Sequence, residues 1–237
     1  MLAPTQFNLN LKLAEQRRFD NFLLQDRNNA MALSVLETFC EFSPQAEQIL
    51  VLWGEHGAGL THLLEAVSFH AQQNCFSVSY FDLASHYQRD PAIVLDGADD
   101  NLLICLDNID VIAGIEAWEH AIFHLFNNMR DRGHKLLMAS HTQPVIMAIL
   151  LADLQSRLLG CVSFEVNALG DEHKQRLLMQ RAHETGLDMP TEVARFIIQR
   201  APRHIHTLFN LLEELDGASL REQRKLTIPF VKSVLGI

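Results

Sequence analysis

The sequence predicts an α/β fold in which a parallel sheet with flanking helices is followed by a small all-helical domain. Strongly apolar stretches alternate with helical ones between residues 49 and 144, a glycine-rich loop follows the first of them, and such stretches stop after about residue 167. Strands that alternate with helices pair in parallel and are covered on both faces. Ligands of such sheets bind outside the carboxyl ends of the strands. We therefore expect the chemistry of this chain at those strand ends.

The chain divides into three parts on this pattern. Residues 1–13 place an apolar side chain at positions 7, 9, 11 and 13, a period of two that predicts an extended tail. Residues 14–167 form the predicted α/β base, and residues 168–237 form the predicted helical domain. The strands are expected at 49–53, 75–83, 101–110 and 134–144, and helices at 61–73, 115–133, 171–186, 190–201 and 203–219, with a further helix before residue 42.

Charge and composition limit the function classes. The chain has 237 residues, of which 48% are hydrophobic, so it can bury a substantial core. Its 19 basic and 29 acidic residues give a net charge of -10, the wrong sign for a protein that neutralises many DNA phosphates. The basic residues that gather near the C-terminus, Arg221, Arg224, Lys225 and Lys232, also fit a solvated helix end. Direct sequence-specific DNA binding is therefore not expected.

The cysteines and the N-terminus indicate a cytoplasmic protein. Four cysteines are widely spaced without a CxxC pair, which predicts buried free thiols rather than a disulfide framework or a zinc site: Cys40, Cys75, Cys105 and Cys161. The first residues lack a basic start followed by a long apolar run, and no stretch approaches the roughly 20 apolar residues of a membrane span. We expect no membrane partner.

The glycine-rich loop is a phosphate-binding motif with one substitution. Residues 54–61 read GEHGAGLT and match G-x-x-x-x-G-K-[ST] at every defined position except the lysine. The glycines let backbone N–H groups turn toward a diphosphate, and the helix N-terminus that follows adds its dipole. The predicted nucleotide contacts are Gly57, Ala58, Gly59, Leu60, Thr61 and His62. The alternative is a glycine-rich turn that binds no ligand.

Leu60 occupies the position of the missing lysine. A hydrogen bond to a charged group contributes about 1.5–3 kcal/mol, so its loss lowers affinity about 10- to 150-fold. The γ-phosphate loses the most support because the lysine normally holds it. We therefore expect a site that binds a nucleoside diphosphate such as ADP and hydrolyses triphosphate poorly.

The apolar stretch at 102–107, LLICLD, has the layout of a Walker B strand that delivers a carboxylate. Asp107 would hold Mg²⁺ together with the Thr61 hydroxyl. Catalytic sites of this kind usually have a second carboxylate next, but the next residue is Asn108, whose amide cannot accept a proton. Asp110 is expected to cap the following helix. The sequence shows no arrangement for covalent catalysis, and the H-x-H pair His204 and His206 points apart on a helix, so no metal site is expected there.

In this order the motifs resemble the AAA+ domain of the bacterial replication initiator DnaA, over residues 18–235. RFDNFLLQDRNNAM at 18–31 resembles the segment beside the adenine, and LDNIDVIAG at 106–114 resembles the Walker B region. ASHTQP at 139–144 is similar to the sensor-1 strand end, and APRHIHTLFNLL at 201–212 to the sensor-2 helix of the lid. The resemblance implies an AAA+ P-loop fold in which the helical domain is the lid over the nucleotide.

The resemblance also implies roles for two arginines. Arg157, in DLQSRLLG, would be an arginine finger presented to the nucleotide of a neighbouring subunit, and Arg203 would reach from the lid into this chain's own site. A guanidinium has a permanent charge and forked donors that suit phosphate oxygens. The alternative for each is an arginine that caps a helix or pairs with a carboxylate.

Two further stretches resemble the regulatory members of this family, which inactivate the initiator after replication has begun. EQRKLTIPFVK at 222–232 is similar to the end of their lid, and the DNA-binding domain that initiators carry after the lid is not expected here. Their tail binds the DNA polymerase III β sliding clamp through a Q-L-x-L-x-L peptide. Gln6, Phe7, Leu9 and Leu11 match that peptide with Phe for the first Leu. An edge strand of the base is the alternative for this segment.

The resemblance implies a function in trans. The tail would bind the clamp, Arg157 would contact the ATP of DnaA, and hydrolysis in the partner's site would leave an inactive initiator and prevent re-initiation. The resemblance is also compatible with a homodimer or larger assembly, because AAA+ domains pair edge to edge, but the sequence leaves the oligomer open. The first alternative is an independent AAA+ ATPase that acts as a loader or remodeller. The second is a DNA-binding initiator paralogue, which the acidic charge opposes.

Overall fold

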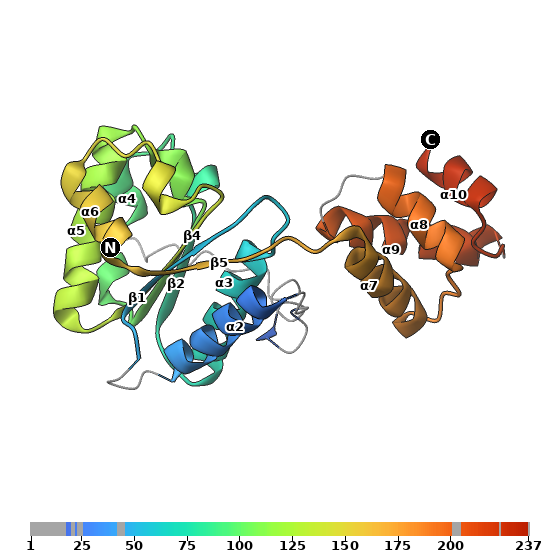
Figure 1. The fold of residues 1–237 in the computed structure, drawn as a ribbon, viewed down its shortest axis with the longest axis horizontal. Helices are drawn as coiled ribbons and strands as arrows, with labels where there is room; N and C mark the ends of the chain where they lie inside the picture. The colour runs from blue at the N-terminus through green and yellow to red at the C-terminus, as the bar shows by residue number, and fades with distance from the viewer. Residues whose placement is uncertain are drawn as a thin grey trace, which may run out of the picture. The chain divides into compact units, whose positions relative to one another are not determined.

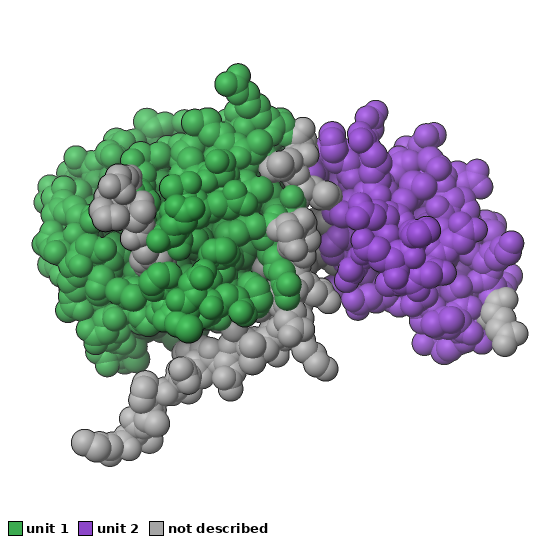
Figure 2. All heavy atoms as spheres, turned by 90° about the horizontal axis from the view of Figure 1, so that it is seen from below, with its two compact units in different colours: residues 1–167 green, residues 168–237 purple. Residues whose placement is uncertain are grey.

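A computed structural model gives the fold and describes residues 18, 19, 22, 26–41, 46–200, 205–222 and 224–236. The chain separates into two compact units, residues 1–167 and 168–237, coloured separately in Figure 2. Each unit has its own apolar core.

Unit 1 is built on a five-stranded parallel sheet with the order β2-β3-β4-β1-β5. The strands are β1 (Ile49–Trp53), β2 (Val78–Asp82), β3 (Leu103–Asp107), β4 (Lys135–Ser140) and β5 (Val162–Glu165). All residues of β3 and β4 are buried, whereas β2 and β5 at the edges are partly or largely exposed. Central parallel strands are covered on both faces, which explains their continuous apolar sequences. The predicted α/β fold with a parallel sheet is confirmed.

Helices cover both faces of this sheet (Figure 1). On one face lie α2 (Arg27–Cys40) and α3 (Leu60–Gln73), and on the other lie α5 (Glu116–Arg132) and α6 (Ala152–Gly160). The short helical elements of this unit are η2 (Leu83–Ser85), α4 (Pro91–Val94), η3 (Ala98–Asp100), η4 (Ile109–Ile112) and η5 (Pro144–Ile146). Trp118 of α5 is almost fully buried in the core under the second face, and its indole N–H donates to the Tyr87 carbonyl at 2.8 Å.

The strand predictions needed correction at three strands. β5 was not predicted, because its four residues VSFE are mostly exposed at the sheet edge and lack a continuous apolar run. The predicted strands at 101–110 and 134–144 were too long: β3 ends at Asp107 and β4 ends at Ser140, and both continuations turn into short helical elements. The carboxyl ends of β1, β3 and β4 nevertheless meet at one edge, as expected.

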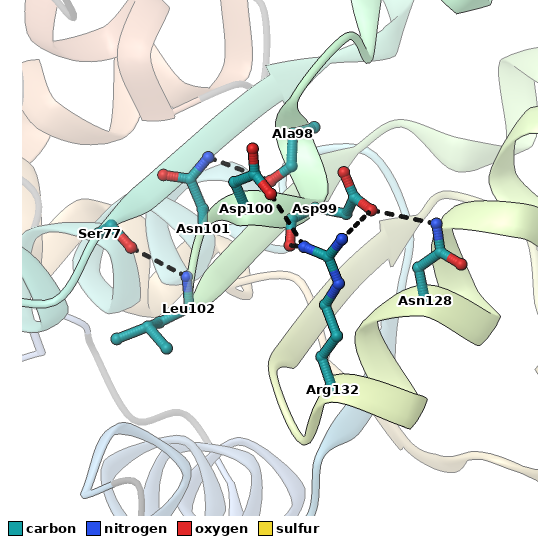
Figure 3. A network of polar contacts seen from close by, with 8 residues as sticks. All are labelled: Ser77, Ala98, Asp99, Asp100, Asn101, Leu102, Asn128 and Arg132. Carbon is teal, nitrogen blue, oxygen red and sulfur yellow. Dashed lines mark hydrogen bonds and ion pairs between the residues drawn. The ribbon is translucent and has the colours of Figure 1, made fainter.

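A polar network fixes the start of the Walker B strand (Figure 3). Arg132, at the end of α5, donates from Nη1 to the Asp99 carbonyl and to Asp100 Oδ1, both at 2.9 Å. Its Nη2 lies 3.3 Å from Asp99 Oδ2, to which Asn128 also donates at 3.1 Å. Ser77 Oγ accepts from the Leu102 N–H at 3.0 Å. The network is largely exposed, so its contribution is positional more than energetic.

Unit 2 consists of α7 (Asp171–Glu184), α8 (Thr191–Arg200), α9 (Ile205–Glu222) and α10 (Ile228–Leu235), packed around their own core. The all-helical prediction is confirmed, but α10 is a fourth helix that was not predicted. Its sequence contains Pro229, which suggests a helix break. The proline lies in the first turn, where its missing N–H costs nothing, and Thr227 caps the helix by accepting from the Phe230 N–H.

The cysteines follow the prediction with one exception. All four are free; Cys40 and Cys105 are buried, Cys161 is partly buried, but Cys75 is exposed, which corrects the expectation of four buried thiols. Burial raises the pKa of Cys40 and of Cys105 to about 12, so both stay protonated and behave as small apolar side chains. Cys75 lies just after α3 with a positive φ of 61°, in a turn at the surface.

Candidate nucleotide site

The phosphate loop lies between the end of β1 and the start of α3, at the carboxyl edge of the sheet. Gly57 and Gly59 adopt φ angles of 87° and 94°, which L side chains rarely tolerate. Gly54 is needed for a close approach, because a Cβ there would lie 2.2 Å from the Val166 carbonyl oxygen. Glycine is therefore the residue that this backbone tolerates at three positions of the loop, and the loop leads directly into the first turn of α3, whose N–H groups can bind an anion.

An aromatic side chain lies against this loop from the segment that precedes α2. A Cβ on Gly59 would approach the Phe22 ring to 2.9 Å. The Phe22 and His62 rings meet edge to face at 5.5 Å, and His62 Nε2 lies 3.0 Å from the Arg18 carbonyl oxygen. His62 thus links the start of α3 to the segment that was expected beside the adenine. Its predicted nucleotide contact stays a prediction.

Leu60 belongs to the apolar core, with 2% of its surface exposed. A lysine at this position has a long stem that brings its ammonium to the phosphates. Leucine packs into the core instead, so the position supplies no charge to the loop.

Asp107, at the end of β3, is buried and fully hydrogen-bonded. Its Oδ2 accepts from Thr61 Oγ1 at 2.6 Å and from the Tyr80 hydroxyl at 2.7 Å, and its Oδ1 accepts from the Asn108 N–H at 3.0 Å. Burial, followed by the negative charge of Asp107, raises the pKa of Tyr80 far above its ordinary range. Tyr80 therefore stays protonated and donates. Sequence reasoning missed this tyrosine, because nothing in the alternation of β2 shows which strand lies beside β3.

The Thr61 and Asp107 pair has the donor set for a Mg²⁺ ion that also binds phosphate oxygens, one hydroxyl and one carboxylate. Their oxygens are 2.6 Å apart, so the same small region contains both protein ligands. Within the described residues no group of three or more His, Cys, Asp or Glu side chains could hold a metal by itself. The residues fit a metal held jointly with a nucleotide.

Asn108 adopts a left-handed conformation, with φ 59°, and its Nδ2 donates to Asp82 Oδ1 at 2.8 Å. Asparagine tolerates this conformation better than most residues. The amide is thus fixed between the ends of β2 and β3, where it cannot act as a base.

Asp110 does not cap a helix, which corrects the prediction. It lies inside η4, and its Oδ1 accepts from the His141 N–H at 2.9 Å. The α5 helix instead begins after Ile115, without a side-chain cap. Asp110 therefore joins the Walker B region to the chain that leaves β4, a contact between segments that sequence position does not reveal.

Two histidines that the sequence did not single out meet at the phosphate loop. The rings of His56, in the loop, and His141, after β4, lie 3.8 Å apart between centroids, and His141 Nδ1 is 3.2 Å from the Gly54 carbonyl oxygen. Both positions belong to motifs recognised in the sequence. The usable signal was that a loop residue and a sensor-strand residue were both histidine.

Arg157 lies in the last turn of α6, where a cation interacts favourably with the helix dipole. The side chain is partly buried, and within the described residues its guanidinium forms no hydrogen bond or ion pair. The alternative of a carboxylate partner is therefore not realised there. Leu159, two residues on, is 50% exposed, and Leu150, before α6, is 70% exposed.

Several predicted residues lie outside the described part of the chain. They are Gln6, Phe7, Leu9 and Leu11 of the tail, and Arg203 and His204 of the lid. Their proposed roles stay predictions. Among the described helices, none combines the length and apolar character that a membrane crossing requires.

The fold and this site define the class of protein. A phosphate loop after β1, a Walker B carboxylate after β3, a β4 end beside the loop and a C-terminal helical lid together define an AAA+ nucleotide-binding module. The family described as the bacterial DnaA ATPase domain matches residues 13–93 and 95–165, and the family described as the Hda lid domain matches residues 171–235. The chain belongs to the DnaA family of AAA+ proteins and has an Hda-type lid.

Solved structures show the same fold. Domain III of DnaA from Thermotoga maritima is 18% identical, with a TM-score of 0.76, over 93% of this chain and 96% of that one. AMPPCP-bound DnaA from Aquifex aeolicus is 19% identical, with a TM-score of 0.71, over 85% of this chain and 65% of that one. The Holliday junction branch migration motor RuvB from Thermotoga maritima is 16% identical, with a TM-score of 0.68, over 94% and 72%.

Proposed function

We propose that this protein is an Hda-type regulator that stimulates hydrolysis of the ATP bound to DnaA. The observation that carries the proposal is the combination of two features in one chain. Its own phosphate loop has a buried leucine in place of the phosphate-binding lysine, whereas Arg157 carries a guanidinium with no described partner. A weak site of its own together with an available cation favours action on another subunit's nucleotide.

The protein's own site supports a binding role. The loop conformation and the Thr61 and Asp107 pair suit a diphosphate with Mg²⁺, and the solved DnaA structure from Aquifex aeolicus contains AMPPCP. We propose that ADP or another nucleoside diphosphate binds here. Bound nucleotide supplies the phosphate oxygens, and Mg²⁺ would supply charge neutralisation between them. Hydrogen bonds from Thr61 and Tyr80 to Asp107 fix the position of the carboxylate beside the phosphate loop.

Arg157 is the proposed arginine finger. A finger supplied in trans accelerates nucleotide hydrolysis by about 10³–10⁵ in other hydrolases, because it stabilises charge that develops on the transferring phosphoryl group. Leu150 before α6 and Leu159 in its last turn expose large apolar side chains, and a protein contact on this part of the surface would bury them in the apolar centre of the interface. The tail residues Gln6, Phe7, Leu9 and Leu11 would bring the protein to the β sliding clamp, by adding an extended peptide to a cleft.

The test measures hydrolysis of ATP preloaded on DnaA, with the clamp loaded on DNA. We expect the intact protein to accelerate hydrolysis, Arg157→Ala to lose the acceleration by about 10³-fold or more, and the triple change of Gln6, Leu9 and Leu11 to alanine to lose it at limiting clamp. Arg89→Ala is the control, because Arg89 is exposed and its side chain, like that of Arg157, has no partner among the described residues. No acceleration by the intact protein, or full activity of Arg157→Ala, would refute the proposal.

A second assay separates the proposal from the rival function. The purified protein alone is given ATP and Mg²⁺. An independent loader or remodeller requires steady turnover in its own site, whereas the buried Leu60 and the fixed Asn108 amide lead us to expect turnover near the uncatalysed background.

A further inference from the structure

Glu119 is a buried carboxylate that the nucleotide site does not use. It lies in the first turn of α5 and has no exposed surface. Among the described residues no cation pairs with it. Its hydrogen-bond partners in the described part of the chain are all backbone N–H groups, so main-chain donors stabilise a charge that is costly to bury.

These donors come from two segments that are distant in sequence. The Gly114 N–H donates to Oε1 at 2.7 Å, the Leu150 N–H lies 3.1 Å from Oε1 and 3.0 Å from Oε2, and the Leu151 N–H donates to Oε2 at 2.7 Å. Gly114 follows η4 and the Walker B carboxylate Asp107. Leu151 is the N-cap residue of α6, the helix that carries Arg157. Glu119 thus joins the chain that follows η4, seven residues after Asp107, to the N-terminus of the Arg157 helix.

We propose that Glu119 is the positioning residue for Arg157, an inference that rests on the proposed arginine-finger role. The side chain of Leu151, the N-cap residue of α6, forms no capping hydrogen bond. Glu119 reaches this end of α6 from α5 and accepts from the Leu150 and Leu151 N–H groups, and its charge interacts favourably with the positive end of the helix. Residues 141–151 connect β4 to α6. Asp110 accepts from the His141 N–H at the start of this segment and Glu119 accepts from the Leu151 N–H at its end, so both ends are anchored by carboxylates that follow Asp107 in the sequence.

The geometry makes the position of Arg157 sensitive to this anchor. Arg157 lies six residues beyond Leu151, or about 9 Å along the helix axis at ~1.5 Å per residue. A tilt of α6 by about 6° at its N-terminus therefore moves Arg157 by about 1 Å, and a displacement of that size can cost about 10²-fold in rate. The same anchor reaches Gly114, so a change in the Walker B region is transmitted to α6 through one side chain.

The test uses Glu119→Gln in the full-length protein. The amide has the same size but only one acceptor oxygen, and its NH₂ group would face N–H donors. In the DnaA-bound ATP assay we expect the rate at saturating protein to fall about 10-fold or more, with the half-saturating concentration changed less than about 2-fold. A variant that is only destabilised shows the reverse, a higher half-saturating concentration with the same saturating rate. Glu116→Gln is the matched control, because Glu116 is an exposed carboxylate in the same turn.

Hydrogen exchange of the free protein is the second measurement, and it does not depend on the proposed function. In Glu119→Gln we expect faster exchange of the Leu150 and Leu151 amides and of α6, with α3 and β3 unchanged. If Arg157→Ala has no effect on DnaA, the proposed function fails, and exchange alone then decides whether Glu119 holds α6. Unchanged exchange across residues 150–158, or an unchanged saturating rate where Arg157→Ala is inactive, overturns the inference.

If Glu119→Gln does not fold, Leu151→Pro tests the same hydrogen bond from its donor, because proline has no N–H to donate to Glu119. Leu151 has φ -76°, an angle that proline adopts, and its N–H has Glu119 as partner. The same fall in saturating rate is expected, and wild-type behaviour in both assays overturns the inference.

Discussion

At the scale of single residues, Leu60 sets the character of the nucleotide site. It converts a position that normally contacts phosphate into part of the core. Gly57 and Gly59 of the loop adopt positive φ angles, and we propose that the main chain still binds phosphate while the lysine contact is missing. The site is therefore expected to bind nucleotide through geometry more than charge.

Leu60→Lys should restore the missing contact. We expect ADP affinity to rise about 10- to 150-fold, measured by titration calorimetry, and the nucleotide-free protein to lose some stability because the lysine stem leaves core packing incomplete. Leu220→Lys adds the same charge at an exposed position and should leave affinity unchanged. Unaltered affinity in a well-folded Leu60→Lys protein would show that the loop does not bind phosphate.

Site residues could be predicted from the sequence where their role is encoded in a short continuous motif. The loop glycines, Thr61 and Asp107 were identified from motifs, because a phosphate loop is encoded in eight consecutive residues. Tyr80 and Glu119 were missed, because their roles depend on which segments tertiary folding brings near them. Asp110 was assigned to a helix cap for the same reason. Its true partner, the His141 N–H, is distant in sequence.

At the scale of elements, the start of α2 is linked to the end of the base. Asp26 caps α2 by accepting from the Asn29 N–H at 2.9 Å, and its Oδ2 accepts from Asn167 Nδ2 at 2.6 Å. Asn29 and Asn167 also exchange two hydrogen bonds, at 2.8 and 3.0 Å. The two hydrogen bonds that Asp26 accepts, that from the Asn29 N–H first and that from the Asn167 side chain second, lower the pKa of Asp26 below its usual 3.8.

Asp26→Ala should destabilise the protein by about 1 kcal/mol, the usual cost of losing a helix N-cap. Because the folded-state pKa is lowered, this contribution is present above the unfolded-state pKa and is lost as the pH falls through the folded-state value. When urea unfolding is measured from about pH 6 downward, the difference in free energy of unfolding between the wild type and Asp26→Ala should shrink below about pH 4. Asp26→Asn keeps the capping acceptor, and its own free energy of unfolding should lack this pH dependence. A difference from the wild type that stays constant with pH for both variants would contradict the assignment.

The predictions missed one strand that lacks an apolar run because it is exposed, and one helix whose first turn contains a proline. The β5 strand has no apolar run because it lies at an edge, and α10 begins with a proline that is harmless only in a first turn. Helices α3 and α5 were predicted well, since both have an apolar face and α5 ends at Gly133 in a left-handed conformation.

At the scale of the whole molecule, the two units have separate cores and should lose structure separately. Leu215 of α9 is fully buried in the core of unit 2. Leu215→Ala should destabilise unit 2 by about 2–5 kcal/mol, so hydrogen exchange accelerates in α7 to α10 while β1, β3 and β4 keep their protection. Leu220→Ala, an exposed position on the same helix, should change neither. Equal acceleration in both units would show that they unfold as one.

The strand order has a consequence for synthesis on the ribosome. β1 emerges first, but it pairs only with β4 and β5, through contacts such as Ile49 with Leu136 and Leu50 with Val162. Until residue 165 has left the exit tunnel, β1 lacks a neighbour on at least one side, and the nascent chain exposes one of its most apolar segments. Pairings of such long range form slowly. The nascent base is therefore a candidate for chaperone protection during that interval. The phosphate loop follows β1, so we expect it to become ordered only when the synthesis of the base is nearly complete.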